Sequence, residues 1–339
     1  MKILIVGRCV ADWHESAWLR AVLEIGYDAE LFCTKGVSSF FDRLQRRILF
    51  GPLILKINRS LIKYISTSLP DVVVLYRALE ISGDTVKSIS NLGITVVTYN
   101  NDNILGFLGK KRYWAFYKRQ IKVSDLNFVY RASDVVYFRK LNPPVYVLKS
   151  HYIPWLHLKN SNSQIERDID LSFLGHYEPD GRDNLMASIL RKFTDKNIVL
   201  KGSNWMKSTQ RSAWNGKDTS EVVGVEYSRL LQQSKISICF LSTWNNDQYT
   251  RRVFEIPAAG GLLLCQRTND LKSLYKEGDE AIFFDGEYEL INQLKFLFEN
   301  PLEIESIAAA GHRRALSSGY DIHSRMNEWI AALNKVKKI

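Results

Sequence analysis

The sequence predicts an α/β protein made of two doubly wound parallel-sheet domains. Three observations support this fold class. The chain has 339 residues, more than a single hydrophobic core usually serves, so two domains are expected. Short apolar runs alternate with segments of helical character, which is typical of parallel strands joined by right-handed crossovers. The same alternation begins again after the polar segment at residues 159–167, which we interpret as a linker.

The first half contributes one series of strands and helices. Met1–Val6 is an apolar run that predicts a buried strand, and a helix is expected at residues 16–25, ended by Gly26. A second helix is expected at residues 84–91. The remaining strands of this half are expected at residues 27–33, 71–76, 94–99, 133–138 and 145–148. Together these elements predict one parallel sheet with helices on its faces.

The second half repeats the arrangement with elements of its own. Its strands are expected at residues 168–175, 197–202, 234–241, 260–265 and 280–284. The helices between them are expected at residues 183–193, 220–233, 252–259 and 290–299. Doubly wound sheets bind ligands outside the carboxyl ends of their strands, so two such domains facing each other would share a deep central cleft.

The cysteines and the apolar segments bear on the compartment. Cys9, Cys33, Cys239 and Cys265 occur singly within or beside apolar runs, without the short spacings of zinc or redox sites, and we expect four buried, reduced thiols. The apolar part of the N-terminus is too short for a signal peptide, and no stretch of about 18 apolar residues occurs. We therefore expect a cytoplasmic protein.

The charge balance favours an anionic partner. The 46 Lys and Arg residues outnumber the 36 Asp and Glu residues, which gives a formal charge of +10. Such a charge suits a phospholipid surface, nucleic acid or a polyanionic substrate, and it does not distinguish among them.

One long segment carries the strongest functional signal. The sequence TRRVFEIPAAGGLLLCQRTNDLKSLYKEGDEAIFFDGEYELINQLKFLFENP follows DIDLSFLGHYEPDGRDNLMASIL and precedes IAAAGHRRALSSGYDIHSRMNEWI. Together these segments resemble the C-terminal donor-binding domain of group 1 glycosyltransferases, most closely the branch with spore-maturation-type and capsule or O-antigen-type transferases. The resemblance covers about residues 168–330.

The resemblance implies the GT-B architecture, in which two Rossmann-like domains face a central cleft. Residues 1–158 would then form the acceptor-binding domain and residues 168–320 the donor-binding domain. Residues 321–339 would form a helix that packs back toward the first domain. The implied reaction is sugar transfer from a nucleotide-sugar donor to a surface polysaccharide or lipid-linked glycan.

A nucleotide-sugar site needs a carboxylate for the ribose hydroxyls and cations for the diphosphate. Glu255 matches the family's ribose-binding position. Arg252, three residues earlier, would share a helix face with Glu255 and reach the diphosphate, unless the two form only a surface pair. Gly260 and Gly261 would let the backbone approach the ligand, unless they form a simple turn.

Two more cations are expected at the phosphates. Arg182 matches the family's phosphate-binding cation in the loop after the first strand of this half, and Lys201 is a second candidate after the next strand. Fixed cations would stabilise the leaving nucleoside diphosphate. Because no DxD motif is evident in a strand-end loop, we expect neither a metal nor another cofactor. The alternative for Arg182 and Lys201 is a solvated loop position.

The first half offers two candidate catalytic residues. Asp102 lies at the end of a predicted strand that resembles the acceptor domain of the same branch. It would act as general base in an inverting enzyme or position the acceptor in a retaining one, and its alternative role is a helix N-cap. His14 lies in the first strand-to-helix loop and would act as base or bind the acceptor; the alternative is a surface histidine.

A basic and aromatic segment at residues 39–66 predicts an interfacial helix on anionic lipid. Its cations are Arg43, Arg46, Arg47, Lys56, Arg59 and Lys63. Such a helix would attach the protein peripherally to the inner face of the cell membrane, close to a lipid-linked acceptor. The alternative is an ordinary amphipathic helix with a solvated basic face.

Three other functions remain open. A nucleotide-sugar epimerase of the same fold would bind the donor without needing an acceptor. A DNA-modifying transferase or nucleic-acid binder would use the positive charge, although we regard nucleic acid as an unfavoured partner. A non-catalytic sugar-binding coat protein is the third, and the presence of Arg182, Arg252 and Glu255 argues against it.

Overall fold

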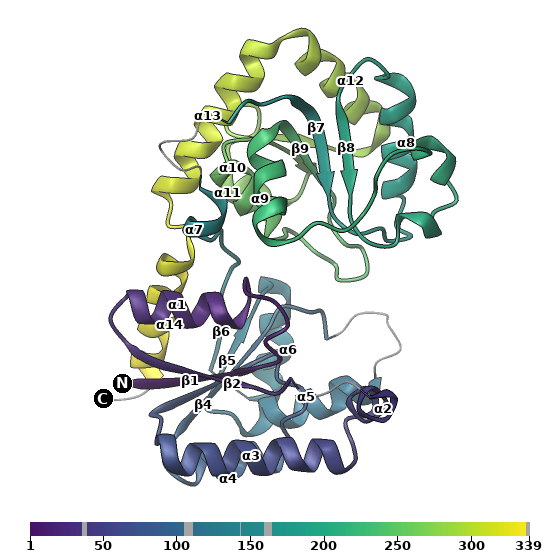
Figure 1. Ribbon diagram of the computed structural model, residues 1–339. Helices are drawn as coiled ribbons and strands as arrows, with labels where there is room; N and C mark the ends of the chain where they lie inside the picture. Colours follow the sequence, from purple (N-terminus) through teal and green to yellow (C-terminus); the bar gives the residue numbers. More distant parts are fainter. Residues whose placement is uncertain (36–38, 105–110, 143, 159–164, 337–339) are drawn as a thin grey trace. The chain divides into compact units, whose positions relative to one another are not determined.

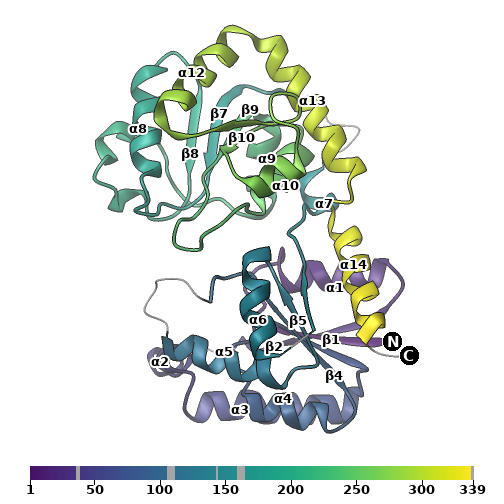
Figure 2. The same cartoon turned by 180° about the vertical axis from the view of Figure 1, so that it is seen from behind.

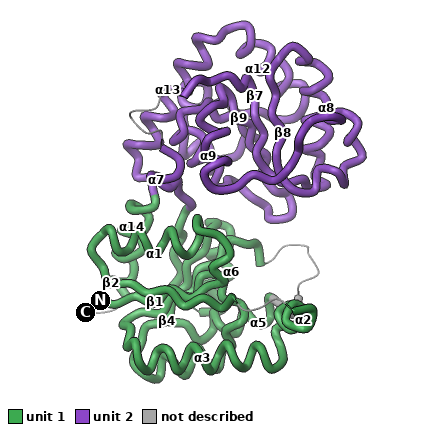
Figure 3. The backbone as a smooth tube through the Cα atoms, viewed as in Figure 1, with its two compact units in different colours: residues 1–149, 322–339 green, residues 150–321 purple. Residues whose placement is uncertain are grey.

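A computed structural model describes residues 1–35, 39–104, 111–142, 144–158 and 165–336. The chain divides into two compact units (Figure 3). Unit 1 consists of Met1–Lys149 and Ile322–Ile339, and unit 2 consists of Ser150–Asp321. Each unit is a parallel α/β domain, as predicted (Figures 1 and 2).

Unit 1 contains a six-stranded parallel sheet with the order β2-β1-β3-β4-β5-β6. The strands are β1 (Lys2–Gly7), β2 (Asp28–Cys33), β3 (Val72–Tyr76), β4 (Thr95–Asn100), β5 (Leu126–Val129) and β6 (Val145–Val147). The strand segments are mostly continuous apolar runs, because both faces of the sheet are covered by helices.

The helices of unit 1 lie on both faces of this sheet (Figures 1 and 2). They are α1 (Glu15–Glu24), α2 (Phe40–Ile48), α3 (Pro52–Ser68), α4 (Gly83–Ser90), α5 (Lys111–Val123), α6 (Val135–Leu141) and α14 (Ile322–Val336). Helices α1 and α14 cover one face, and α3 and α4 pack their apolar side chains on the other.

The expected strand at residues 133–138 was wrong. A 3₁₀ turn, Ala132–Asp134, leads there into helix α6, and the strand of this region is β5. The neighbouring Val135 and Val136 suggested a strand because both are β-branched. In the structure Val136 is exposed and Phe138 is the buried residue of the helix. The tertiary position of the segment thus overrides its local preference.

The C-terminal helix α14 belongs to unit 1. The ring of Trp329 lies 6.0 Å from that of Trp18 in α1 and 6.3 Å from that of Phe128 in β5. His323 Nε2 lies 2.6 Å from Glu24 Oε2, which adds a polar contact to the aromatic packing. The chain therefore returns from unit 2 to complete the core of unit 1.

Residues 150–158, which the sequence placed in the first domain, lie in unit 2. Helix α7 (Pro154–His157) packs there, and Gln232 Nε2 donates hydrogen bonds to the carbonyl oxygens of His157 and Leu158 at 3.2 and 3.3 Å. Most of the linker that we expected at residues 159–167 lies outside the described residues.

Unit 2 contains a five-stranded parallel sheet with the order β11-β10-β9-β7-β8. The strands are β7 (Ile169–Leu174), β8 (Ile198–Lys201), β9 (Ser234–Cys239), β10 (Leu262–Gln266) and β11 (Ile282–Phe284). The other helices are α8 (Arg182–Lys192), α9 (Gly224–Gln233), α10 (Arg252–Ala258), α11 (Asn269–Leu274), α12 (Gly286–Glu299) and α13 (Pro301–Ser317). The five strands match the five that we predicted.

Each sheet has one place where the strand order reverses. In unit 1 the chain passes from β1 outward to β2 and then returns to β3 on the other side of β1. In unit 2 it passes from β7 to β8 and returns to β9. Ligands of doubly wound sheets bind outside the carboxyl ends of the strands at such a reversal. The ends of β1 and β3, and those of β7 and β9, are therefore the places to examine for function.

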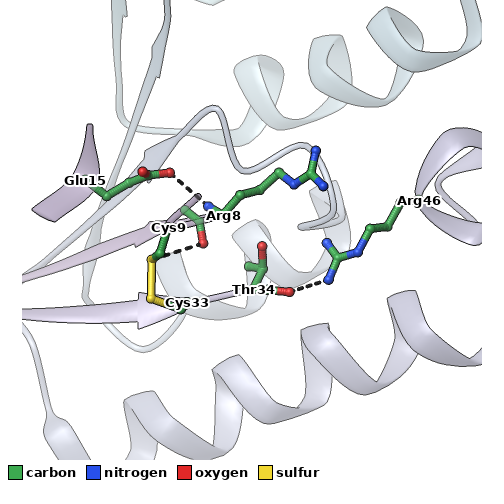
Figure 4. The surroundings of a disulfide bond; sticks show 7 residues. Arg8, Cys9, Glu15, Cys33, Thr34 and Arg46 are labelled. Carbon is green, nitrogen blue, oxygen red and sulfur yellow. Dashed lines mark hydrogen bonds between the residues drawn. A yellow bond between two sulfur atoms is a disulfide. The ribbon is translucent and has the colours of Figure 1, made fainter. Parts of the chain in front are cut away.

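The expectation of four reduced thiols was wrong for two of them. Cys9 and Cys33 form a disulfide bond with their Cα atoms 5.5 Å apart (Figure 4). Parallel pairing of β1 with β2 sets Gly7 opposite Cys33, which brings Cys9 within reach although 24 residues separate the pair. Cys239 and Cys265 are free and buried, as expected. Disulfides are rare in a reducing cytoplasm, so this bond is unusual for the cytoplasmic protein that we expected.

Candidate functional site

The strand reversal of unit 2 holds a histidine and a glutamate that we did not predict. His176 follows β7, and its Nε2 lies 2.7 Å from Glu178 Oε1. Ser242, which follows β9, donates a hydrogen bond from Oγ to Glu178 Oε2 at 2.7 Å. The His176 side chain is 52% exposed, whereas that of Glu178 is largely buried. An exposed imidazole is therefore held in place by an anchored carboxylate.

Glu178 remains ionised at this position. Burial alone would raise its pKa, but the hydrogen bonds from His176 and Ser242, together with the charge of Arg182, lower the pKa to about 2. An ionised carboxylate that accepts a hydrogen bond from the imidazole fixes the orientation of the His176 ring. The pair therefore holds an exposed imidazole in a fixed orientation at the strand ends, where a ligand of this fold would bind.

Arg182 does not stand free at this edge. It is buried at the start of α8, and its guanidinium donates to Asp180 Oδ1 at 2.8 Å and to Asp180 Oδ2 at 2.6 Å. It also donates to the carbonyl oxygen of His176 at 2.9 Å and lies 3.3 Å from Glu178 Oε2. Asp180 and Glu178 balance its charge, and its binding to the donor phosphates stays a prediction. Arg182 holds the loop that carries His176 and Glu178.

Arg252, another cation predicted at the diphosphate, lies beside the end of β7. Its Nη1 donates to the carbonyl oxygen of Leu174 at 3.3 Å, and its guanidinium lies 5.7 Å from the ring centroid of Phe173. The guanidinium thus sits at the carboxyl end of β7. A Cβ atom at Gly175 would come within 2.8 Å of Arg252 Nη1, so only glycine lets the arginine lie so close to this strand end.

Glu255 lies in the first turn of α10 and is only 1% exposed. Tyr227 donates a hydrogen bond from its hydroxyl to Glu255 Oε2 at 2.6 Å. Arg251 Nε lies 2.6 Å from Glu255 Oε1, and His157 Nε2 lies 3.4 Å from the same oxygen. The carboxylate expected to bind ribose is thus surrounded by three groups of unit 2, and none of the three was predicted.

The charges of this buried cluster are well defined. Burial would raise the pKa of Glu255, but Arg251 and the other neighbouring donors lower it, so the carboxylate is ionised. Burial lowers the pKa of His157 to about 4. His157 Nδ1 accepts a hydrogen bond from the backbone N–H of Ile153 at 2.9 Å, which leaves the proton on Nε2, toward Glu255. A neutral histidine thus supports an anionic glutamate.

Gly260 and Gly261 do not lie at the ligand-binding edge. They connect the end of α10 to the start of β10, which is the amino end of that strand. Gly260 has a φ of 77°, the left-handed conformation that ends many helices. Arg167 donates to the carbonyl oxygen of Ala259 at 2.9 Å beside it. Ligands of doubly wound sheets bind at the opposite edge, and the approach of these glycines to a nucleotide stays a prediction.

Lys201 is the last residue of β8, at the carboxyl edge as expected. Its Nζ forms an ion pair with Asp218 and lies 3.3 Å from Ser220 Oγ. Asp218 is exposed, so the pair is solvated and can exchange partners at little cost in free energy. Lys201 can therefore still contribute positive charge at this edge.

Both candidate catalytic residues of unit 1 contact the end of β3. Asp102 Oδ2 accepts a hydrogen bond from Arg77 Nη2 at 2.6 Å, and Arg77 directly follows β3. His14 Nδ1 lies 3.3 Å from the hydroxyl of Tyr76, the last residue of β3. The structure thus brings Asp102 and His14 to the strand reversal of unit 1.

Arg46 is not a surface cation. Its Nη1 lies 2.5 Å from Glu80 Oε1, and its Nη2 donates to the carbonyl oxygen of Thr34 (Figure 4). The Arg46 side chain is 13% exposed and that of Glu80 is 4% exposed. Arg46 was therefore wrongly counted among the membrane-facing cations. The other five are exposed: Arg43, Arg47, Lys56, Arg59 and Lys63.

The sequence reasoning missed His176, Glu178 and His157 for different reasons. His176 and Glu178 stand two residues apart in a loop, and that spacing has no periodicity to mark it. A histidine and an acid immediately after a predicted strand of the donor domain were nevertheless a usable signal. His157 is 98 residues from Glu255 in sequence, and only the packing of α7 brings the two together.

The comparisons with known proteins agree with this architecture. Residues 182–331 match the family model described as glycosyl transferase-like. No curated protein sequence matches the chain. Among solved structures, HepE of Anabaena in complex with UDP-glucose has a TM-score of 0.67 at 10% identity, with 99% of this chain and 100% of that chain covered.

Two further structures share the fold. The sucrose-phosphate synthase of Thermosynechococcus elongatus has a TM-score of 0.72 at 9% identity over 99% of this chain and 100% of that one. The UDP-GlcNAc 2-epimerase of Neisseria meningitidis bound to UDP-GlcNAc has a TM-score of 0.56 at 12% identity, with the same coverage. The chain thus has the two-domain GT-B fold, and residues 182–331 form its glycosyl transferase-like segment.

Proposed function

We propose that this protein transfers a sugar from a nucleotide-sugar donor, bound at the carboxyl ends of β7 and β9 in unit 2, to a glycan acceptor bound by unit 1. One observation carries the proposal. The strand reversal of the unit that matches the glycosyl transferase-like model combines an arginine, Arg252, with an imidazole fixed by a carboxylate. Basic N–H groups at a strand reversal suit a diphosphate.

The transfer replaces one glycosidic bond with another. The bond between the anomeric carbon and the diphosphate oxygen breaks, and that oxygen keeps the electron pair. The acceptor oxygen bonds to the anomeric carbon and loses its proton. Arg252 and Lys201 would balance the charge of the departing diphosphate. We therefore propose that no divalent metal is required, and chelation with EDTA during a donor-consumption assay tests this.

Asp102 and His14 are the groups proposed to act on the acceptor. Asp102 would take the proton of the attacking hydroxyl in an inverting reaction or position that hydroxyl in a retaining one. The hydrogen bond from Arg77 holds the Asp102 carboxylate at the end of β3. Glu255 is proposed to bind the ribose and, through Tyr227 and Arg251, to hold the start of α10 beside the donor.

The acceptor is proposed to be a surface polysaccharide or a lipid-linked glycan. Phe40 and Phe41 on α2 are exposed beside Arg43 and Arg47, which supports peripheral contact with an anionic lipid surface. No helix in the described part of the chain combines the length and apolar character that a bilayer crossing requires.

A thermal-shift screen with UDP-, GDP-, dTDP-, ADP- and CMP-linked sugars tests donor binding, because a ligand of the native state raises the unfolding temperature. We expect one nucleotide class to raise it. The variant Glu178→Gln should reduce the shift, because it removes the carboxylate that fixes the His176 ring at the strand ends. The matched control Glu226→Gln changes an exposed glutamate of α9 in the same unit and should keep the full shift. No shift with any donor would contradict the proposal.

The second candidate function is nucleotide-sugar epimerisation. The fold similarity to UDP-GlcNAc 2-epimerases favours keeping it, although their TM-scores of 0.56 to 0.59 lie below the 0.67 and 0.72 of the glycosyltransferase of Rickettsia africae and the sucrose-phosphate synthase. Incubation with the donor alone separates the two functions. An epimerase changes the sugar without an acceptor, whereas a transferase requires the acceptor for turnover.

A further inference from the structure

Unit 1 contains a cavity of about 580 Å³ that neither candidate catalytic residue lines. Its lining residues come from the α2–α3 turn, helix α3, the start of α4 and helix α5. Helices α3, α4 and α5 all begin near the carboxyl edge of the strands. The volume is within the range of about 300 to 1,000 Å³ that small-molecule sites occupy.

The wall of the cavity is largely apolar. It is lined by Leu49, Phe50, Ile54, Leu55, Ile62 and Phe116. The polar lining residues bond mainly to the protein itself. Asn58 Nδ2 donates to the carbonyl oxygens of Ile54 and Glu80, and Asn58 Oδ1 accepts from the backbone N–H of Ser82 at 2.8 Å. A ligand inside would therefore meet mostly hydrocarbon.

The rim of the cavity carries a net positive charge. Arg59 and Lys63 line it four residues apart on α3, so they lie on the same face of the helix. Both are exposed, and neither forms an ion pair with another described residue. Asp84, in the first turn of α4, is the acidic lining residue. Two cations above an apolar wall match a hydrocarbon chain that ends in a phosphate.

Two of the apolar lining residues are themselves exposed to solvent. Phe50 is 67% exposed and Leu55 is 57% exposed, and both also line the cavity. An apolar wall that continues out to exposed apolar side chains gives a hydrocarbon chain a route in from a bilayer without crossing a polar surface.

We propose that this cavity holds the hydrocarbon chain of a lipid-linked acceptor, with the lipid phosphate bound between Arg59 and Lys63. The inference rests on the proposed function, because it names the acceptor class of the same reaction. The chain would anchor the acceptor to unit 1, while its glycan extends to the strand reversal where Asp102 and His14 lie.

Alkyl phosphates test this proposal without donor or turnover. Isothermal titration compares octyl, decyl and dodecyl phosphate below their micellar concentrations. Each methylene transferred from water into an apolar site strengthens binding by up to about fourfold. We expect at least a tenfold gain from octyl to dodecyl phosphate. Equal affinity for all three chains, or no binding, would overturn the proposal.

Variants locate the chain and the phosphate. Leu55→Glu should weaken dodecyl phosphate binding at least tenfold, and Phe50→Glu provides a second variant of an exposed lining residue. Leu69→Glu is the matched control, because Leu69 is 73% exposed at the end of α3 and does not line the cavity. The double variant Arg59→Glu/Lys63→Glu should weaken dodecyl phosphate binding and leave dodecanol binding unchanged.

A final arm separates an acceptor lipid from ordinary bilayer lipid. Farnesyl phosphate should compete with dodecyl phosphate for the wild-type protein. If only phosphatidylglycerol vesicles competed, or if Leu55→Glu and Leu69→Glu bound dodecyl phosphate equally well, the proposal would be rejected. Nucleotide-sugar binding to unit 2 is measured without acceptor, so a failure here leaves that result intact, and the reverse also holds.

Discussion

The buried His157 predicts a specific loss of stability in acid. In the native protein burial lowers its pKa from 6.5 to about 4. Between these two values the unfolded chain binds a proton that the native chain does not. The contribution of His157 is therefore fully present above about pH 6.5 and is lost as the pH falls toward 4.

The magnitude follows from the size of the shift. A difference of about 2.5 pKa units corresponds to about 3.4 kcal/mol in full, and at pH 4.5 about 2.5 kcal/mol of it is lost. The change His157→Gln removes the titrating group but keeps a polar side chain beside Glu255. The variant should be less stable than the wild type at pH 7.5 and should lose about 2.5 kcal/mol less on going to pH 4.5.

Urea unfolding at pH 7.5 and pH 4.5, followed by tryptophan fluorescence, measures this difference. The quantity compared is the change in unfolding free energy between the two pH values, which cancels the pH-independent cost of the substitution. His312→Gln is the control, because His312 lies in the same unit and contacts the carbonyl oxygen of Pro257 instead of Glu255. Equal pH dependence of the wild type and His157→Gln would refute the reasoning.

Three further predictions concern other parts of the chain. Arg46→Ala should lower the unfolding free energy by about 3 kcal/mol, because it leaves the buried Glu80 without its nearest cation. In the same urea experiment, the unfolding free energy of the control Arg47→Ala, which changes an exposed neighbour, should differ from the wild-type value by no more than about 0.5 kcal/mol. Thiol labelling of denatured, unreduced protein should count two thiols, and after reduction four; four before reduction would contradict the Cys9–Cys33 bond. Asp102→Asn should reduce turnover about 100-fold or more while leaving the donor-induced thermal shift unchanged, and a lost shift would place Asp102 in donor binding instead.

The strands of both sheets were largely predictable because parallel strands buried on both faces are continuous apolar runs. The five strands of unit 2 and most of unit 1 were found in this way. The failure at residues 133–138 shows the limit of the method. Short apolar segments have no periodicity that separates a strand from a helix, and only the neighbouring elements decide.

The candidate site was predictable in position more than in detail. Doubly wound folds bind ligands at the carboxyl ends of their strands. The predicted residues Asp102, His14, Lys201 and Arg252 all lie at such strand ends. Their partners come from distant segments, and spacing does not encode them. Arg182 differs, because its carboxylate partners, Glu178 and Asp180, come from its own loop.

The places of the glycines and cysteines in the fold were missed for the same physical reason. Gly260 and Gly261 satisfy a local rule for close backbone approach, but the direction of β10 places them at the amino edge of the sheet. Cys9 and Cys33 look unpaired in sequence, but the register of β1 against β2 brings them together. Sheet topology, which a single sequence specifies only indirectly, decides both outcomes.

The most direct measurement is a crystal structure of the protein grown with the nucleotide sugar that gives the largest thermal shift. We predict that the diphosphate lies at the carboxyl ends of β7 and β9, within hydrogen-bonding distance of His176 or Arg252. A nucleotide bound at any other part of unit 2, or at unit 1, would contradict the central claim.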